Sequence, residues 1–236
     1  MIERTKRENN QALLLVFAKA PRLGSGKTRL ARAIGRAGAL RISRALQGKT
    51  LREAMDPRWE TRLLVAERKD LNRRFPGIWP QPVVLARDVQ GAGDLGERLA
   101  AAFNQAGSVA VIGADCPQLK RGVLAKALRG LRRAPFVIGP AEDGGFWFFA
   151  ARQGHQACAA FAGVRWSSQH ACADLIANCP GPVLVTQTLQ DIDRFEDWRE
   201  YQRERRERRA YIALRPDASA SRSGASSPYR ARQIRK

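Results

Sequence analysis

With 236 residues, of which 44% are hydrophobic, the chain has the size of one α/β domain of roughly 200 residues plus a tail. Its early apolar run is far shorter than the roughly 18 residues of a membrane span and follows the charged start MIERTKRENN, and its four cysteines form no C-x-x-C pair, so we expect a cytoplasmic protein with reduced thiols and no membrane partner. The formal charge of +20 favours anionic partners such as nucleotides, nucleic acid or lipid without specifying one, and arginine-rich composition can equally reflect a GC-rich genome.

Apolar, β-prone runs alternate with helical segments along the chain, which is typical of a mostly parallel sheet. These runs predict strands at 13–18, 62–66, 82–85, 109–113, 136–139 and 183–186, with a further apolar run at 146–150. The intervening segments predict helices at 27–55 (one or two), 95–106, 122–132, 167–177 and 195–214. We expect residues 1–11 to form a basic extension, 12–214 the folded domain, and 215–236 a disordered basic tail.

The segment LLLVFAKAPRLGSGKTRL ends an apolar run in a glycine-rich loop that leads into a predicted helix. Backbone N–H groups of such a loop point at an anion, and Lys27 and Arg29 would neutralise its charge. Gly24 and Gly26 allow close approach to a phosphate because they carry no Cβ atom. The ending GSGKT resembles a P-loop, but Pro21 replaces the first glycine of that pattern. We therefore expect a phosphate site of another kind.

The segment VAVIGADCPQL predicts a second contribution to this site. Its buried strand delivers Asp115 to the carboxyl end of the sheet, where open α/β proteins place their ligands, and Pro117 ends the strand there. A carboxylate facing a phosphate loop suits Mg²⁺ or Mn²⁺ held between protein and substrate phosphates. By position alone, Asp115 can equally cap the following helix.

Two further groups of carboxylates follow apolar runs. Asp143 precedes Gly144 and Gly145 in the segment EDGGFWFF, which forms either part of a site or an ordinary Asp-Gly hairpin turn. Asp191 and Asp193 in LQDIDRFEDW can face one cation from an extended segment, or Asp193 can cap the final helix.

The segment QGAGDLGERL places three glycines before a predicted helix. A loop this open can wrap a base or a ribose. Its simpler interpretation is an ordinary loop with a helix cap at Asp94.

Five segments together, FAKAPRLGSGKTRL, GDLGER, IGADCPQL, GPAEDGGFWF and DIDRFEDW, resemble in order and spacing the DUF2064 family of glycosyltransferase A-like transferases. That family is similar to a branch of the nucleotide-diphospho-sugar transferase superfamily, whose members include guanylyltransferases that act on molybdenum cofactor and on phospholactate. The resemblance covers residues 13–198. It implies a GT-A, Rossmann-like three-layer α/β sandwich with a mostly parallel central sheet.

The resemblance also implies roles for individual residues, with a nucleoside triphosphate or nucleotide-sugar donor, a small acceptor, and Mg²⁺ or Mn²⁺. Catalysis falls to Lys27, Asp115 and Asp143. Nucleotide binding falls to Ala18, Gly24, Gly26, Lys27, Arg29, Asp94, Leu95 and Gly96. Acceptor binding falls to Asp143, Gly144 and Gly145, and metal binding to Asp115, Asp191 and Asp193.

The chain departs from the family pattern at two places. The family usually has a bulky aliphatic residue before the lysine, where this chain has Gly26. It usually has two tyrosines after the DGG turn, where this chain has Phe146 and Trp147. The second departure removes hydroxyls that would orient an acceptor.

We therefore expect a metal-dependent transferase that moves a nucleotidyl or glycosyl group to a small acceptor. Glycosyl transfer would require a general base, for which Asp143 is the candidate. The alternatives are a P-loop-type phosphotransferase, with GSGKT as its phosphate loop, and a non-catalytic nucleotide- or RNA-binding protein that uses the basic tail.

Overall fold

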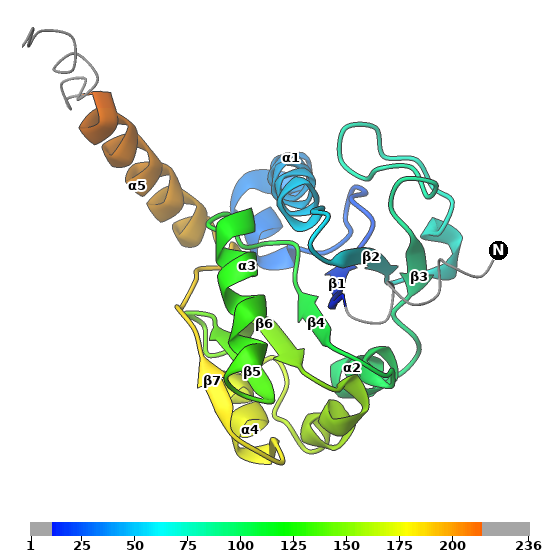
Figure 1. The fold of residues 1–236 in the computed structure, drawn as a ribbon. Coiled ribbons are helices and arrows are strands. Elements are labelled where there is room, and N and C mark those ends of the chain that lie inside the picture. The colour runs from blue at the N-terminus through cyan, green and yellow to red at the C-terminus, as the bar shows by residue number, and fades with distance from the viewer. Residues whose placement is uncertain (1–10, 214–236) are drawn as a thin grey trace, which may run out of the picture. The chain divides into compact units, whose positions relative to one another are not determined.

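The computed structural model describes residues 11–213, which form a seven-stranded sheet with helices on both faces (Figure 1). The strands are β1 (Leu13–Ala18), β2 (Glu60–Val65), β3 (Arg87–Val89), β4 (Val109–Ile112), β5 (Phe136–Pro140), β6 (Phe146–Ala151) and β7 (Val183–Val185). The α-helices are α1 (Thr28–Ala54), α2 (Leu95–Phe103), α3 (Arg121–Arg129), α4 (Ala171–Asn178) and α5 (Phe195–Ala213). Short 3-10 helices span Arg68–Asp70, Gly130–Arg132 and Gly154–Phe161.

The strand order is β3-β2-β1-β4-β6-β5-β7. Strand β6 runs antiparallel to both of its neighbours, and every other pair is parallel, which confirms the prediction of a mostly parallel sheet. In register, Leu13 of β1 lies opposite Glu60 of β2 and Val109 of β4. The three central parallel strands therefore end at the same edge, and the loops after β1 and β4 meet there.

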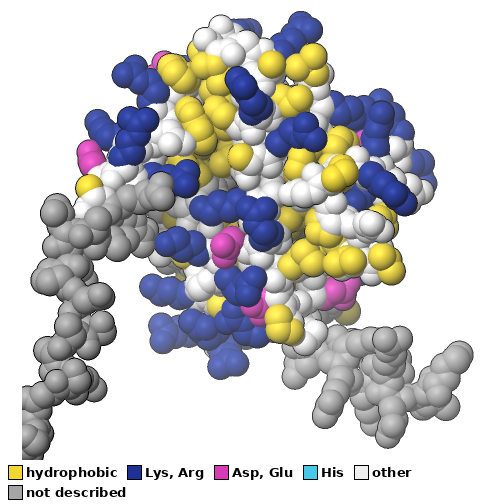
Figure 2. Space-filling view, turned by 90° about the horizontal axis from the view of Figure 1, so that it is seen from above, with side chains coloured by type: hydrophobic (Ala, Val, Ile, Leu, Met, Phe, Trp, Pro, Cys, Tyr) yellow, Lys and Arg dark blue, Asp and Glu magenta, His cyan; other side chains and the backbone are white. Residues whose placement is uncertain are grey.

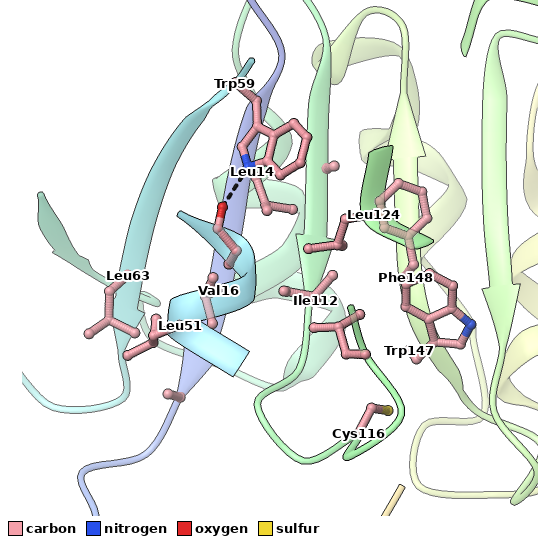
Figure 3. Packing of buried hydrophobic residues seen from close by; sticks show 14 of the residues in the cluster. Leu14, Val16, Leu51, Trp59, Leu63, Ile112, Cys116, Leu124, Trp147 and Phe148 are labelled. Atoms are coloured by element: carbon pink, nitrogen blue, oxygen red, sulfur yellow. Dashed lines mark hydrogen bonds between the residues drawn. The ribbon is translucent and has the colours of Figure 1, made fainter. Parts of the chain in front are cut away.

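The side chains of β1 alternate between the two helical layers, as the period of a strand requires. Leu14 and Val16 pack with Leu51 of α1 and Leu124 of α3 on one face (Figure 3). Leu15 packs on the other face, in the cluster that includes residues of α2 and α4. Full burial contributes about 1.5–3 kcal/mol for each such side chain. Both faces of β1 are thus anchored, which fixes the position of the loop that follows it.

The predicted strand at 82–85 is wrong, because these residues form turns and the third strand is β3. Val83 and Val84 are 88% and 63% exposed, and the N–H group of Val84 bonds the carbonyl of Gln81 at 2.8 Å. Their apolar character therefore reflects no burial. The true strand is a polar edge strand, since Arg87 starts it and Asp88 is exposed.

Two helix predictions also change in detail. The prediction at 27–55 corresponds to α1, in which Gly35 adopts φ 74° and ψ 161° and divides the helix in two. The prediction at 167–177 corresponds to α4, which begins only at Ala171, because Ser167 adopts φ 58° and stops a helix from forming there. The 3-10 helix Gly154–Phe161 was not predicted, since its pattern of small residues carries no clear period.

One compact unit ends at Trp198, and a second unit begins at Arg199. Within residues 11–213, no helix combines the length and the apolar character needed to cross a membrane. The predicted basic tail and all but the last residue of the predicted N-terminal extension lie outside the described residues.

Candidate active site

The loops at the carboxyl ends of β1 and β4 open onto a cavity of about 1100 Å³. Its lining includes nine of the predicted site residues, namely Gly26, Lys27, Arg29, Leu95, Asp115, Asp143, Gly145, Asp191 and Asp193. The other five predicted residues do not line it, namely Ala18, Gly24, Asp94, Gly96 and Gly144. Segments that are distant in the sequence thus meet at one place, as the rule for strand ends predicts.

The first wall of the cavity is the loop of residues 19–27, called here the phosphate loop. Gly24, Gly26 and Lys27 adopt φ values of 80°, 68° and 48°, and successive backbone conformations of this kind shape an anion-binding concavity. Lys27 directly precedes α1, whose first turn contains no acidic side chain. The first N–H groups of a helix have no partner within it and favour negative charge. The left-handed conformation costs Lys27 about 1–2 kcal/mol, and such strain is commonly found at functional sites.

Lys27 forms an ion pair with Asp115 across the cavity, with 2.9 Å between Nζ and Oδ2. The lysine side chain is 13% exposed and the aspartate side chain 39%. Burial acts to lower the pKa of Lys27, but Asp115, and to a smaller extent Asp193 and Asp191, outweigh it and raise the pKa above its ordinary value. Lys27 therefore remains a cation throughout the physiological range.

A second ion pair connects the same two sides of the site. Arg29 of α1 contacts Asp193, with 2.8 Å between Nη1 and Oδ2. The N–H groups of Asp193 and Arg194 donate to Oδ2 of Asp197, at 2.9 Å and 2.6 Å. The side chain of Asp197, and not that of Asp193, thus caps the start of α5. The side chain of Asp193 instead forms the ion pair with Arg29.

Asp191 feels the charge of two other carboxylates. Burial raises its pKa to about 6, and repulsion from Asp115 and Asp143 adds to that rise against an opposing effect of Lys27. The backbone fixes this proximity, because the N–H group of Ile192 donates to the carbonyl of Asp115 at 3.2 Å. Either a proton or a bound cation relieves such repulsion between carboxylates.

In the part of the chain that the structure describes, no three His, Cys, Asp or Glu side chains are grouped closely enough to hold a metal ion by themselves. Mg²⁺, however, is usually held by one or two carboxylates together with substrate phosphates. The crowded pair of Asp115 and Asp191 fits that requirement. Asp193, the third predicted ligand, pairs with Arg29 instead.

The second wall is the DGG turn of Asp143, Gly144 and Gly145. The side chain of Asp143 accepts a hydrogen bond from the N–H group of Gly145 at 2.9 Å, which is the ordinary stabilisation of such a turn. Gly144 adopts φ 85°, and a Cβ atom there would lie 2.2 Å from the carbonyl oxygen of Gln169. Close packing against residue 169 therefore requires glycine at this position.

At the start of α2 the structure shows the helix cap that was the simpler interpretation of this segment. Asp94 and Glu97 form a capping box, in which each side chain accepts a hydrogen bond from the backbone of the other residue. A Cβ atom on Gly96 would lie 2.7 Å from Nε1 of Trp166, so this glycine permits helix packing. Leu95 is 39% exposed and lines the cavity.

Among the lining residues that were not predicted as site residues are Lys19, Phe146, Trp166, Gln190 and Arg194. The rings of Phe146 and Trp166 meet edge to face, with centroids 6.4 Å apart, and give the cavity an apolar wall. Gln190 is 6% exposed, and its Oε1 atom has no hydrogen-bond partner. Two of these carried a sequence signal: Lys19 directly follows the strand that leads into the phosphate loop, and Phe146 stands where the family usually has a tyrosine.

Basic side chains are spread over the face seen in Figure 2, where hydrophobic side chains and a few acidic ones also lie. The formal charge of +20 is therefore at least partly expressed on the surface of the protein. A positive field of this kind raises the local concentration of anions and speeds their binding.

Three solved structures share this architecture at low sequence identity. A candidate nucleotide-diphospho-sugar transferase from Desulfovibrio desulfuricans G20 is 23% identical, with a TM-score of 0.73 over 91% of this chain and 92% of that one. The 4-diphosphocytidyl-2C-methyl-D-erythritol synthase of Anaerococcus prevotii DSM 20548 is 11% identical, with a TM-score of 0.51 over 80% and 95%. A CMP:2-keto-3-deoxy-manno-octonic acid synthetase in complex with CTP is 10% identical, with a TM-score of 0.50 over 86% and 99%. These likenesses confirm the predicted fold, that of the nucleotide-diphospho-sugar transferases.

No curated protein sequence matches the chain. The sequence profile of DUF2064, described as "uncharacterized protein conserved in bacteria", matches residues 50–168. This match covers half of the chain and includes Asp94, Asp115 and the DGG turn. The protein therefore belongs to the DUF2064 family, as its motifs predicted.

Proposed function

We propose that this protein is a metal-assisted transferase, which moves a nucleotidyl or glycosyl group from a nucleoside triphosphate or a nucleotide-sugar to a small acceptor. The observation that carries the proposal is the ion pair of Lys27 and Asp115, at 2.9 Å, between an open helix N-terminus and the crowded carboxylate of Asp191. One cavity thus offers both a site for a diphosphate and oxygen ligands for a divalent cation.

The phosphate loop supplies the chemistry of the leaving group. The N–H groups at the start of α1 and the ammonium group of Lys27 bind the diphosphate, and Lys27 stabilises the negative charge that develops as the bond to it breaks. Asp115 and Asp191 would hold Mg²⁺ or Mn²⁺, which supplies Lewis-acid charge at the phosphate oxygens. When the donor binds, Lys27 exchanges its contact with Asp115 for contacts with phosphate.

The opposite wall serves the acceptor. In nucleotidyl transfer, an acceptor phosphate attacks the α-phosphorus directly and needs positioning more than a general base. In glycosyl transfer a base is required, and Asp143 of the DGG turn is the candidate. The cytidylyl synthase and the CTP-bound synthetase among the structural neighbours support the nucleotidyl reaction.

The other two functions have less support. A P-loop phosphotransferase would need a glycine at Pro21, and the neighbours with this fold are transferases of another kind. RNA binding through the basic tail concerns residues outside the described part of the chain. Binding of RNA by the tail does not account for the carboxylates beside the phosphate loop.

A thermal-shift screen tests the proposal. Nucleoside triphosphates and nucleotide-sugars are added with and without Mg²⁺ or Mn²⁺ to wild type, to Asp115→Asn, and to Asp88→Asn, whose exposed carboxyl lies outside the cavity. A ligand at about 100 times its dissociation constant stabilises the fold by about 2.7 kcal/mol. We expect a metal-dependent shift for one donor that survives in Asp88→Asn and is lost in Asp115→Asn. If no donor shifts the wild type, the proposal fails.

A further inference from the structure

We propose that the segment between β2 and β3, residues 66–86, braces the phosphate loop, and that Asp70 and Gln47 are positioning residues for diphosphate binding. The proposal rests on the function proposed above, because it assigns these residues to the same phosphate site. Neither residue lines the cavity, so each acts through the loop.

The first contact of the brace is a buried ion pair. Arg22, in the middle of the phosphate loop, donates from Nη2 to Oδ1 of Asp70, which is only 1% exposed. The loop folds around Arg22, because its carbonyl accepts the N–H group of Ser25 at 3.1 Å. A buried carboxylate strongly favours the one loop conformation that brings a cation to it, since an unpaired buried charge is costly.

The second contact holds the beginning of the loop. Nε2 of Gln47, on α1, donates to the carbonyl of Lys19 at 3.0 Å. The indole Nε1 of Trp79 donates to Oε1 of the same glutamine at 2.8 Å. Gln47 and Trp79 are 7% and 4% exposed, so both hydrogen bonds are shielded from water. The brace therefore meets the phosphate loop at two places, one direct and one through α1.

A single guanidinium group holds the brace itself together. Arg87 donates to the carbonyls of Leu71, Arg73 and Pro80 at 3.0, 2.8 and 2.5 Å. It also stacks on Trp79, with 5.2 Å from its Cζ atom to the ring centroid. Both contact residues of the brace, Asp70 and Trp79, are thus fixed to β3.

The phosphate loop needs such support because its tip makes few contacts of its own. A Cβ atom on Gly24 would have no neighbour within 4 Å, and Leu23 is 63% exposed. Glycines with positive φ also leave the backbone many alternative conformations. Hydrogen bonds to residues outside the loop therefore determine which conformation the loop adopts.

The test compares Asp70→Asn with a matched control, Asp56→Asn. Asp56 also has a shielded side chain, 6% exposed, and pairs with Arg58, but it lies after α1 and outside the cavity. Two quantities are measured: hydrogen–deuterium exchange of peptides covering residues 19–27, and calorimetric affinity for inorganic pyrophosphate with Mg²⁺. We expect Asp70→Asn to speed loop exchange and to weaken pyrophosphate binding, each by about tenfold, as for other residues that orient ligand-binding groups. The control should change neither, and Arg22→Lys should retain most of the wild-type affinity.

A second variant covers the case in which Asp70→Asn does not fold. Gln47→Met keeps the volume of the side chain, removes the bond to the carbonyl of Lys19, and should speed the exchange of the same peptides. Unchanged loop exchange in a folded Asp70→Asn or Gln47→Met protein overturns the brace. Faster exchange in a protein whose wild type binds no pyrophosphate supports the brace and contradicts the proposed function instead.

Discussion

Two glycine turns, one in each of two segments that contribute residues to the cavity, use the same residue for opposite reasons. Gly24 of the phosphate loop and Gly144 of the DGG turn both adopt positive φ, 80° and 85°. Around Gly24 a Cβ atom would meet nothing within 4 Å, whereas at Gly144 it would lie 2.2 Å from the backbone of Gln169. The first turn has free space at its glycine, and the second is closed by the protein itself. The phosphate loop is thus loosely packed at Gly24, and the DGG turn is tightly packed at Gly144.

The largest expected effect is that of Gly144→Ala. The clash with the backbone at 169 and the left-handed conformation together should lower the free energy of unfolding by about 3 kcal/mol. Urea denaturation of the variant and the wild type measures the difference. A loss below about 1 kcal/mol would mean that the segment at 169 yields easily, and the contrast between the two turns would disappear.

Lys27→Met tests the phosphate loop by binding rather than by stability. Loss of a charge-assisted hydrogen bond should cost about 2 kcal/mol, or roughly 30-fold in the dissociation constant of pyrophosphate with Mg²⁺. Titration calorimetry of both proteins gives the ratio, and Lys126→Met on α3, outside the cavity, is the control. Equal affinities would remove Lys27 from the phosphate site.

The crowded carboxylate of Asp191 predicts a pH effect of definite sign. Its pKa in the folded protein is about 6, against an ordinary 3.8, so stability falls as pH rises between these values. The rise corresponds to about 3 kcal/mol, which solvent screening of this partly exposed group reduces to about 1.5 kcal/mol. Asp191→Asn should therefore melt with the wild type below pH 4 and above it at pH 8 in metal-free buffer. Thermal unfolding across this pH range checks the sign, and a variant less stable at pH 8 would contradict it.

Gly24→Ala should have the smallest effect. With free space around the Cβ atom, only the left-handed backbone conformation costs energy, about 1 kcal/mol. Gly24→Asn should cost less, because asparagine tolerates that conformation. The same urea experiment measures both. A loss as large as that of Gly144→Ala would show that the phosphate loop is as closely packed as the DGG turn.

The order of strands and helices was accessible from the sequence because most buried strands here are continuous apolar runs. Residues 13–18 and 109–112 are buried on both faces of the sheet, so their composition reflects their position. The third strand was predicted at the wrong residues for the converse reason. It lies at the edge of the sheet with polar residues, while the exposed Val83 and Val84 nearby mimic a strand.

The residues of the candidate site likewise divide into those that could be predicted from the sequence and those that could not. Lys27 directly precedes a helix and Asp115 lies three positions after β4, so the topology of a parallel sheet was enough to bring them together. Trp166 and Gln190 reach the cavity from irregular segments, whose paths depend on tertiary packing. The brace of the phosphate loop could not be predicted from the sequence either, because Arg22 and Asp70 are 48 positions apart and form no recognisable motif.

The pairing of β1 with β4 links the candidate site to the stability of the sheet. Lys27 and Asp115 are 88 positions apart, and their proximity depends on this one strand pair. A diphosphate and metal held by both residues would act as a reversible cross-link that closes a long loop. The sheet could not separate there while the ligand stayed bound. Resistance to proteolysis would then rise and fall with the supply of donor substrate.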